Sequence, residues 1–235
     1  MEKGMAGVLL GIGVGPGDPE MLTLKAIKAI KESDVICLPR GEKDKCIAYQ
    51  IALPVVPELR YKKTIAFDYE MTKDKSRLKQ LHQEFYDKYK QLLFDGYNLA
   101  FLTIGDPTIY STFGYIMNLA QKDGIEVEII NGITSFCGSA AAANILLSEA
   151  NENIHIVSGQ ENLEENLKLP GTKIIMKSGR NISSIKEQLI QLEDDGQINV
   201  IAVADCGKET EQIYKTAITI PEDSRYMMTI IVKEA

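Results

Sequence analysis

The chain has 235 residues, 45% of them hydrophobic and 25% charged, which is typical of a soluble globular protein with one large or two small domains. A formal net charge of −7 argues against a general nucleic-acid-binding protein, and four widely spaced cysteines without a C-x-x-C pair argue against a zinc site or a disulfide framework. Since no apolar run approaches the ~20 residues of a membrane span and the N-terminus does not resemble a signal peptide, we expect a cytoplasmic protein that binds neither membranes nor metals.

The first half of the chain alternates between apolar strands and amphipathic helices. A strand over residues 7–13 runs into a glycine loop, and a helix follows in which Leu24, Ile27 and Ile30 recur at helical spacing. The same patterns predict strands at 34–40, 62–67 and 99–104, and helices at 46–52, 72–95 and 109–122. Strands and helices in strict alternation predict a mostly parallel, doubly wound sheet.

The second half has a different order of elements. Residues 121–124 indicate a linker, so we expect an N-terminal α/β domain at 1–120 and a C-terminal α/β domain at 121–235. Strands are predicted at 127–130, 154–159, 172–179, 199–205, 213–220 and 226–233, and helices from 134, at 161–167 and at 182–192. The last two strands have no helix between them, which predicts a mixed sheet in the C-terminal domain.

Gly-Asp-Pro occurs twice, at 17–19 and 105–107, each time between a predicted strand and a predicted helix. Aspartate can cap a helix and proline suits its first position, so a helix is expected to start at each turn. Ligands of open α/β sheets bind beyond the carboxyl ends of strands, and Gly105 lets a ligand approach the backbone closely. Both turns are expected to face one cleft, although a plain strand-to-helix connection is the alternative interpretation of each.

The glycine loop at 11–18 matches a dinucleotide-binding fingerprint poorly. Pro16 stands where the third glycine belongs, and Pro39 and Arg40 stand where an acidic residue should follow the second strand. His82 and His155 lie within a predicted helix and a predicted strand, and the chain lacks the common hydrolase, metalloprotease and P-loop motifs. So few catalytic side chains favour a protein that binds and orients a reactive cofactor.

Basic residues gather between Leu38 and Lys79, although the whole chain is acidic. This basic segment has a net charge of +4 from ten basic residues (Arg40, Lys43, Lys45, Arg60, Lys62, Lys63, Lys73, Lys75, Arg77, Lys79) and six acidic ones (Glu42, Asp44, Glu58, Asp68, Glu70, Asp74). It is either a solvated surface or a binding surface for a polyanionic small molecule.

Three stretches resemble, in order, the signature blocks of the tetrapyrrole (precorrin) methylases: GIGVGPGDPEMLTLKA, LTIGDPTIYST and NGITSFCGSAAAANILL. The resemblance covers essentially the whole chain. It implies two α/β domains with a cofactor cleft between them, and methyl transfer from S-adenosylmethionine, with S-adenosylhomocysteine as product, to a corrin or sirohaem precursor. The stretches GDPTIYST, AFDYEMTKDK and TSFCGSAAAA are most similar to the enzymes that methylate C-20 of precorrin-2 or cobalt-factor II in cobalamin biosynthesis. Asn131, where the family usually has proline, and residues 144–146 depart from the family pattern.

The resemblance also implies the site residues. Cofactor-binding positions are Pro16, Ile104, Gly105, Asp106, Ile109, Thr134, Ser135, Met176 and Ala204. Substrate-binding positions are Gly15, Gly17, Asp18, Arg40, Tyr110 and Ser111. Tyr110 and Asp18 are the candidates for removing the proton that methylation releases, and the basic segment would meet the substrate's carboxylates.

Family members of this kind pair through two-fold interfaces, so a homodimer is expected. Methylation of another corrin position or of uroporphyrinogen III stays open, and so does a different class, a nucleotide-binding regulatory module without catalysis. Whether the substrate contains cobalt also stays open, because a metal held by the macrocycle needs no ligand motif in the protein.

Overall fold

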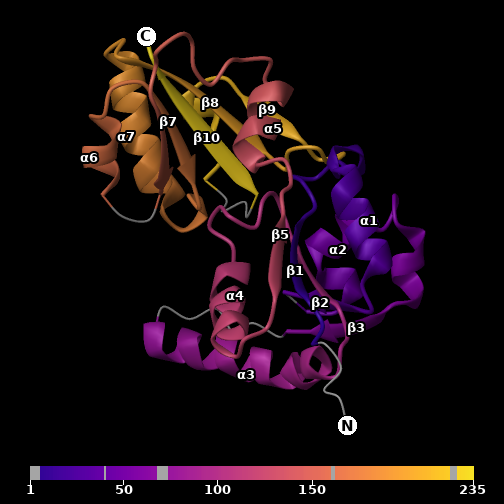
Figure 1. Ribbon diagram of the computed structural model, residues 1–235. Coiled ribbons are helices and arrows are strands. Elements are labelled where there is room, and N and C mark those ends of the chain that lie inside the picture. Colours follow the sequence, from indigo (N-terminus) through magenta and orange to yellow (C-terminus); the bar gives the residue numbers. More distant parts are fainter. Residues whose placement is uncertain (1–5, 40, 68–73, 160–161, 223–226) are drawn as a thin grey trace. The chain divides into compact units, whose positions relative to one another are not determined.

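The computed structural model describes residues 6–39, 41–67, 74–159, 162–222 and 227–235 (Figure 1). The chain divides into two compact units, Met1–Thr134 and Ser135–Ala235.

The first unit is built on a five-stranded sheet. Its strands are β1 (Leu9–Gly13), β2 (Val35–Leu38), β3 (Lys63–Ala66), β4 (Leu99–Thr103) and β5 (Val127–Ile130). Their order is β3-β2-β4-β1-β5, and every neighbouring pair is parallel. The central strands β1 and β4 are buried along their whole length, as expected for continuous apolar runs covered on both faces.

Helices cover both faces of this sheet (Figure 1). One core lies under α1 (Leu24–Glu32) and α2 (Ile47–Ala52), and the other lies under α3 (Lys75–Phe94) and α4 (Phe113–Lys122). Adjacent residues of β1 enter opposite cores, Leu10 the first and Leu9 the second, because side chains alternate along a strand. The predicted doubly wound sheet is thus confirmed, and it is entirely parallel.

The second unit contains the predicted mixed sheet. Its strands are β6 (Ile154–Ser158), β7 (Thr172–Met176), β8 (Ile198–Ala204), β9 (Gln212–Tyr214) and β10 (Met228–Glu234), in the order β6-β7-β10-β8-β9. Only the β6–β7 pair is parallel. Helices α6 (Leu163–Leu167) and α7 (Ile182–Asp194) line one face, and Figure 1 shows α5 (Ser135–Ala142) on the other.

The boundary between the units differs from the expected one. Strand β5 was assigned to a C-terminal domain beginning at residue 121, but it pairs in parallel with β1 and forms an edge of the first sheet. The division therefore falls between Thr134 and Ser135. The supposed linker at 121–124 is the last two residues of α4 and the start of the turn to β5, where Gly124 has a φ of 74°.

Two helices also begin later than predicted. After Gly-Asp-Pro at 105–107 a loop continues until α4 begins at Phe113. After the first Gly-Asp-Pro, Asp18 caps only the 3-10 turn η1 (Pro19–Met21), and α1 begins after its own cap, Thr23. An aspartate before a proline can close a single turn as readily as it starts a helix. The expected strand at 213–220 is likewise wrong, because β9 ends at Tyr214 and the 3-10 turn η5 (Ala217–Thr219) follows.

Candidate functional site

Two glycine loops meet at the carboxyl edge of the first sheet. The Gly15 N–H donates to the Gly105 carbonyl at 3.3 Å, and the Gly105 N–H donates to the Gly15 carbonyl at 2.7 Å. Both residues have positive φ angles, 78° and 70°, which glycine adopts without strain. The loops that follow β1 and β4 are therefore joined, backbone to backbone, at the edge where an open α/β sheet binds its ligands.

The end of β5 packs against the same loops. A Cβ atom on Gly13 would lie 2.5 Å from the Gly105 carbonyl oxygen, and one on Gly132 would lie 2.2 Å from it. Real Cβ atoms do not approach an oxygen so closely, so both positions require glycine. Because β1 lies between β4 and β5, these glycines let the loop after β4 cross the end of β1 and reach the loop after β5.

The Asp106 carboxylate holds that crossing in place, and only 6% of the residue is exposed. Its Oδ1 accepts the Thr108 N–H at 2.8 Å and the Thr108 hydroxyl, while Oδ2 accepts the Asn131 amide and the Gly132 N–H, each at 3.0 Å. Burial alone would raise the pKa of Asp106, but the hydrogen bonds from these three residues outweigh burial and lower it. Four bonds occupy the acceptor sites of a carboxylate, so this side chain shapes the loop.

The rest of the loop after β4 presents apolar and hydroxyl groups. Ile104 and Ile109 are half-buried, and 45% of Tyr110 is exposed. Tyr110 has a φ of 49°, a left-handed conformation that costs a non-glycine residue about 1 kcal/mol or more and is frequent at functional sites. The Ser111 hydroxyl accepts the Phe113 N–H at 3.0 Å and so fixes the entry to α4.

The expected residues of the glycine loop after β1 lie beside Gly105. Gly15, Pro16 and Gly17 are buried, and Asp18 is half-buried with its Oδ1 accepting the Glu20 N–H at 2.8 Å. The first unit therefore brings together, at one sheet edge, the loop residues that the sequence assigned to cofactor and substrate.

In the second unit, Met176 and Ala204 end β7 and β8 at the same edge, on either side of the start of β10. Met176 is half-buried and Ala204 is buried. Each is followed by a residue in the left-handed conformation, Lys177 with a φ of 56° and Asp205 with a φ of 51°. The Ser178 hydroxyl is buried without a hydrogen-bond partner among the described residues. Two strained residues at one edge are again typical of a functional site.

Thr134 and Ser135 are consecutive residues that lie on either side of the division between the units. Thr134 is the last residue of the first unit, and Ser135 is the first residue of α5. Both are half-buried.

The described residues of the basic segment do not form one surface. The Lys43 ammonium donates to the Arg60 carbonyl at 3.0 Å, and the Lys62 ammonium donates to the Lys31 carbonyl at 2.9 Å. Arg77 pairs with a glutamate of its own helix, α3. Helices α3 and α2 cover opposite faces of the sheet, so Arg77 does not lie on the same face as α2. Arg40 lies outside the described residues, as do Asp68, Glu70 and Lys73.

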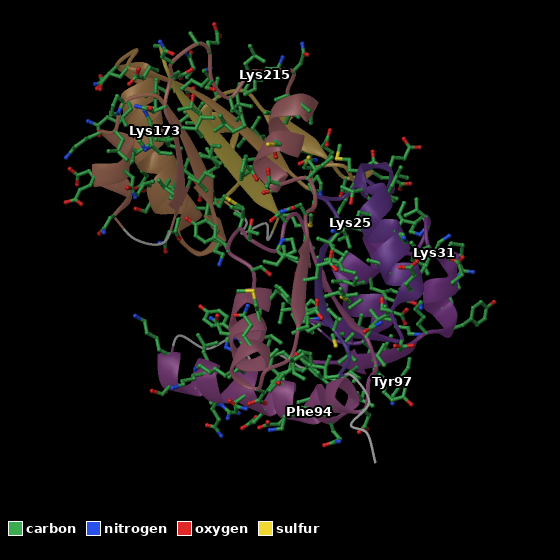
Figure 2. All side chains as sticks on the ribbon, viewed as in Figure 1. Lys25, Lys31, Phe94, Tyr97, Lys173 and Lys215 are labelled. Atoms are coloured by element: carbon green, nitrogen blue, oxygen red, sulfur yellow. The ribbon has the colours of Figure 1, made fainter. Side chains whose placement is uncertain are left out.

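Lysines of α1 are also engaged at the surface. Figure 2 shows Lys25 and Lys31 extending from this helix. Lys25 pairs with Glu128 of β5 at 2.6 Å, and Lys31 pairs with Glu58 at 3.3 Å. Exposed ion pairs of this kind contribute little to stability. In each pair, the glutamate neutralises the charge of the lysine.

A cavity of about 560 Å³ lies at the opposite edge of the second sheet from Met176 and Ala204. Its lining includes Lys173, labelled in Figure 2, whose ammonium donates to the Leu169 carbonyl at 3.1 Å. Burial lowers the pKa of Lys173. None of the described residues that were assigned to cofactor or substrate lines this cavity.

Within the described ranges, no group of three or more histidine, cysteine, aspartate or glutamate side chains is arranged to hold a metal ion. No helix in that part of the chain is long and apolar enough to cross a membrane.

Asn131 and Gly132 were not predicted as parts of the site, and Asn131 was noted only as a position where the family usually has proline. The signal for Gly132 was a glycine two residues after the end of the strand predicted at 127–130. The role of this glycine follows from the pairing of β5 with β1. That pairing was not expected, because the predicted domain boundary placed β5 in the C-terminal domain.

Comparisons with known proteins extend over both units. The family model of the Tetrapyrrole (Corrin/Porphyrin) Methylases matches residues 8–221. A probable cobalt-precorrin-2 C(20)-methyltransferase of Methanocaldococcus jannaschii is 39% identical over 225 residues, 95% of this chain and 94% of that protein. A precorrin-2 C(20)-methyltransferase of Sinorhizobium sp is 30% identical over 195 residues, 78% of each chain. The structure of Thermus thermophilus uroporphyrin-III C-methyl transferase, complexed with S-adenyl homocysteine, has a TM-score of 0.72 at 20% identity and covers 97% of both chains.

Proposed function

The chain belongs to the tetrapyrrole methylase family, and we propose that it is the S-adenosylmethionine-dependent methyltransferase that methylates C-20 of precorrin-2 or cobalt-factor II in cobalamin biosynthesis. The observation that carries this proposal is the 39% identity with the Methanocaldococcus jannaschii relative over 95% of the chain. A match of this extent includes the loops at the carboxyl ends of the first-unit strands and the ends of β7 and β8 in the second unit. The family match supports the reaction class, and the two C(20) relatives support the position of methylation.

The first-unit edge suits S-adenosylmethionine. Gly105 presents backbone without a side chain, and the half-buried Ile104 and Ile109 offer apolar surface for an adenine ring. Thr134 and Ser135 supply hydroxyl groups that can hydrogen-bond the polar parts of the cofactor. We assign Pro16, Asp106, Met176 and Ala204 to cofactor binding on the family resemblance alone, with Asp106 acting through its backbone because its carboxylate is occupied.

When bound, S-adenosylmethionine supplies a methyl group that is already electrophilic. Methylation forms a carbon–carbon bond at C-20 as the carbon–sulfur bond breaks, and the methylated carbon then loses one proton. The protein's main task is therefore to align the two reactants and exclude competing orientations. We propose Tyr110 and Asp18 as the candidate proton acceptors, since Tyr110 is exposed on the loop after β4 and Asp18 lies on the joined loop after β1.

The tetrapyrrole would meet Gly15, Gly17, Asp18, Tyr110 and Ser111 at this edge. Arg40 follows the last residue of β2, Leu38, by two positions in the sequence, and its assignment to the substrate rests on the sequence alone. Arginine suits this role because its planar guanidinium holds a carboxylate through two hydrogen bonds.

The proposal is tested by incubating the purified protein with S-adenosylmethionine and, separately, precorrin-2, cobalt-factor II and uroporphyrinogen III. We expect a mass gain of one methyl group on precorrin-2 or cobalt-factor II, and none on uroporphyrinogen III. Transfer to uroporphyrinogen III would favour the alternative substrate. Tight S-adenosylmethionine binding with no transfer to any tetrapyrrole would favour a regulatory module and contradict the proposal.

A further inference from the structure

The hydrogen bonds of Asp106 join two loops that are not neighbours in the sheet. Asp106 follows β4, and Asn131 and Gly132 follow β5, whereas β1 lies between these strands. The Asp106 carboxylate spans the end of β1 to reach the Asn131 amide and the Gly132 N–H, each at 3.0 Å. We call these two bonds the Asp106–Asn131 clip.

The clip acts on the backbone of Gly105. That residue is adjacent to Asp106, and its N–H and carbonyl are both bonded to Gly15. If the carboxylate loses its partners across β1, the Gly105 loop keeps its two bonds to Gly15 and the local bonds from Thr108 and Ile109 to Asp106, but it loses these two bonds to the loop after β5. The position of Gly105 therefore depends on Asn131 and Gly132, which hold the other end of the clip.

Asn131 contributes more than space filling. The residue is exposed, so packing against neighbours does not fix the orientation of its side chain. Its amide nevertheless donates directly to the buried Asp106 carboxylate. A hydrogen bond to a charged group is about twice as strong as one between neutral groups. A carboxylate at position 131 would instead place a second negative charge against Asp106.

We infer that Asn131 is a positioning residue, which holds Asp106 through the clip and so fixes the Gly105 backbone in the geometry that binds S-adenosylmethionine. This inference rests on the proposed function for the identity of the ligand. Asn131 itself touches neither reacting atom in this account.

The test compares Asn131→Ala and Asn131→Asp with the wild type, by calorimetry with S-adenosylhomocysteine. Asn131→Ala should raise the Kd about fivefold, the scale of a typical net hydrogen bond, because water competes for the bond of an exposed side chain. Asn131→Asp should raise it about thirtyfold at a pH of about 8, and that loss should shrink at a pH of about 5 as the carboxylate pair takes up a proton. The matched control is Asn118→Ala, an exposed asparagine on α4, which should bind as the wild type does.

A second measurement needs no ligand. Amide hydrogen exchange reports the Gly105 N–H, bonded to Gly15, and the Gly132 N–H, bonded to Asp106. In free Asn131→Ala protein both amides should exchange about tenfold faster than in the wild type, with the strands of the sheet unchanged.

The outcomes separate the two claims. If the wild type fails to bind S-adenosylhomocysteine, the proposed function fails, while the exchange data still support or overturn the clip. Wild-type exchange rates in Asn131→Ala would overturn the clip. Faster exchange with an unchanged Kd would overturn the positioning role, and so would a pH-independent loss of affinity in Asn131→Asp. A purely structural role predicts a lower Tm without a change in the Kd of the folded protein.

Discussion

Gly105 is the residue on which the candidate site depends most directly. With a φ of 70° and both backbone groups bonded to Gly15, it lies buried at the sheet edge and has no side chain to separate its backbone from a ligand. Gly105→Val adds a branched side chain where the cofactor is proposed to lie, and it also strains the turn. We expect calorimetry to show a Kd for S-adenosylhomocysteine raised at least about thirtyfold, the result of losing roughly 2 kcal/mol of contact.

Gly124 provides the matched control for that variant. It has a similar φ of 74°, lies in the turn between α4 and β5, and a Cβ added there would meet no atom within 4 Å. Gly124→Val therefore carries the same backbone strain without approaching the site. If folded Gly105→Val binds as tightly as Gly124→Val, the cofactor does not lie against Gly105.

At the scale of elements, helix α3 carries two tyrosines one turn apart whose hydroxyls differ. The Tyr86 hydroxyl donates to Asp123 at 3.1 Å, while the Tyr89 hydroxyl is buried and has no hydrogen-bond partner in the described part of the chain. Tyr89→Phe removes an unsatisfied polar group and should raise the free energy of unfolding by about 1 kcal/mol. Tyr86→Phe should lower it by about 1 kcal/mol. Urea denaturation measures both, and equal effects of the same sign would contradict this account of the α3 core.

The contact between α3 and α4 predicts an acid-sensitive stability. His82 is 3% exposed and stacks on Tyr115, with ring centroids 4.3 Å apart. Burial lowers the pKa of His82 below its unfolded value of about 6.5, so below that pH the unfolded chain binds a proton that the folded chain does not. The free energy of unfolding should therefore fall as the pH drops through about 6.5 toward the folded pKa, with no contribution from His82 above it.

His82→Phe keeps an aromatic ring against Tyr115 but cannot take up a proton. Urea denaturation at several pH values should show a smaller loss of stability on acidification for His82→Phe than for the wild type. An identical pH dependence in the two proteins would show that the acid sensitivity arises elsewhere.

The elements show why the sequence predicted the sheets better than the turns. Buried runs such as Leu99–Thr103 have one stable location, the centre of a covered sheet, so their pattern is decisive. The short strand β5 has no such signature, because its apolar and polar residues fit an edge of either sheet. The Asp-Pro pairs are compatible with a helix start, a 3-10 turn or a loop. At Asp106 the outcome depends on partners in the loop after β5, on the other side of β1.

The site was predicted unevenly for the same reason. Motifs located both Gly-Asp-Pro turns, and parallel topology brought them to one edge. The role of the Asp106 carboxylate could not be predicted, because its partners lie 25 residues away and across another strand. The basic segment was a poor guide, since carbonyl groups from its own unit engage Lys43 and Lys62.

For the whole molecule, the family resemblance predicts a homodimer, which is also the commonest oligomer of soluble proteins. Sedimentation velocity at micromolar concentration should show a species of twice the chain mass of 26.1 kDa. A single species at the mass of one chain would contradict the dimer, and it would leave the proposed reaction in place.

The central claim is methyl transfer to C-20, and the position of the new methyl group tests it most directly. The protein is incubated with S-adenosylmethionine carrying a ¹³C-labelled methyl group and with whichever of precorrin-2 and cobalt-factor II accepts it. Carbon NMR of the isolated product then shows which carbon bears the label. We predict a single labelled methyl group on C-20. A label on any other carbon of the macrocycle, or an unlabelled tetrapyrrole recovered from a protein that binds S-adenosylmethionine, would contradict the account.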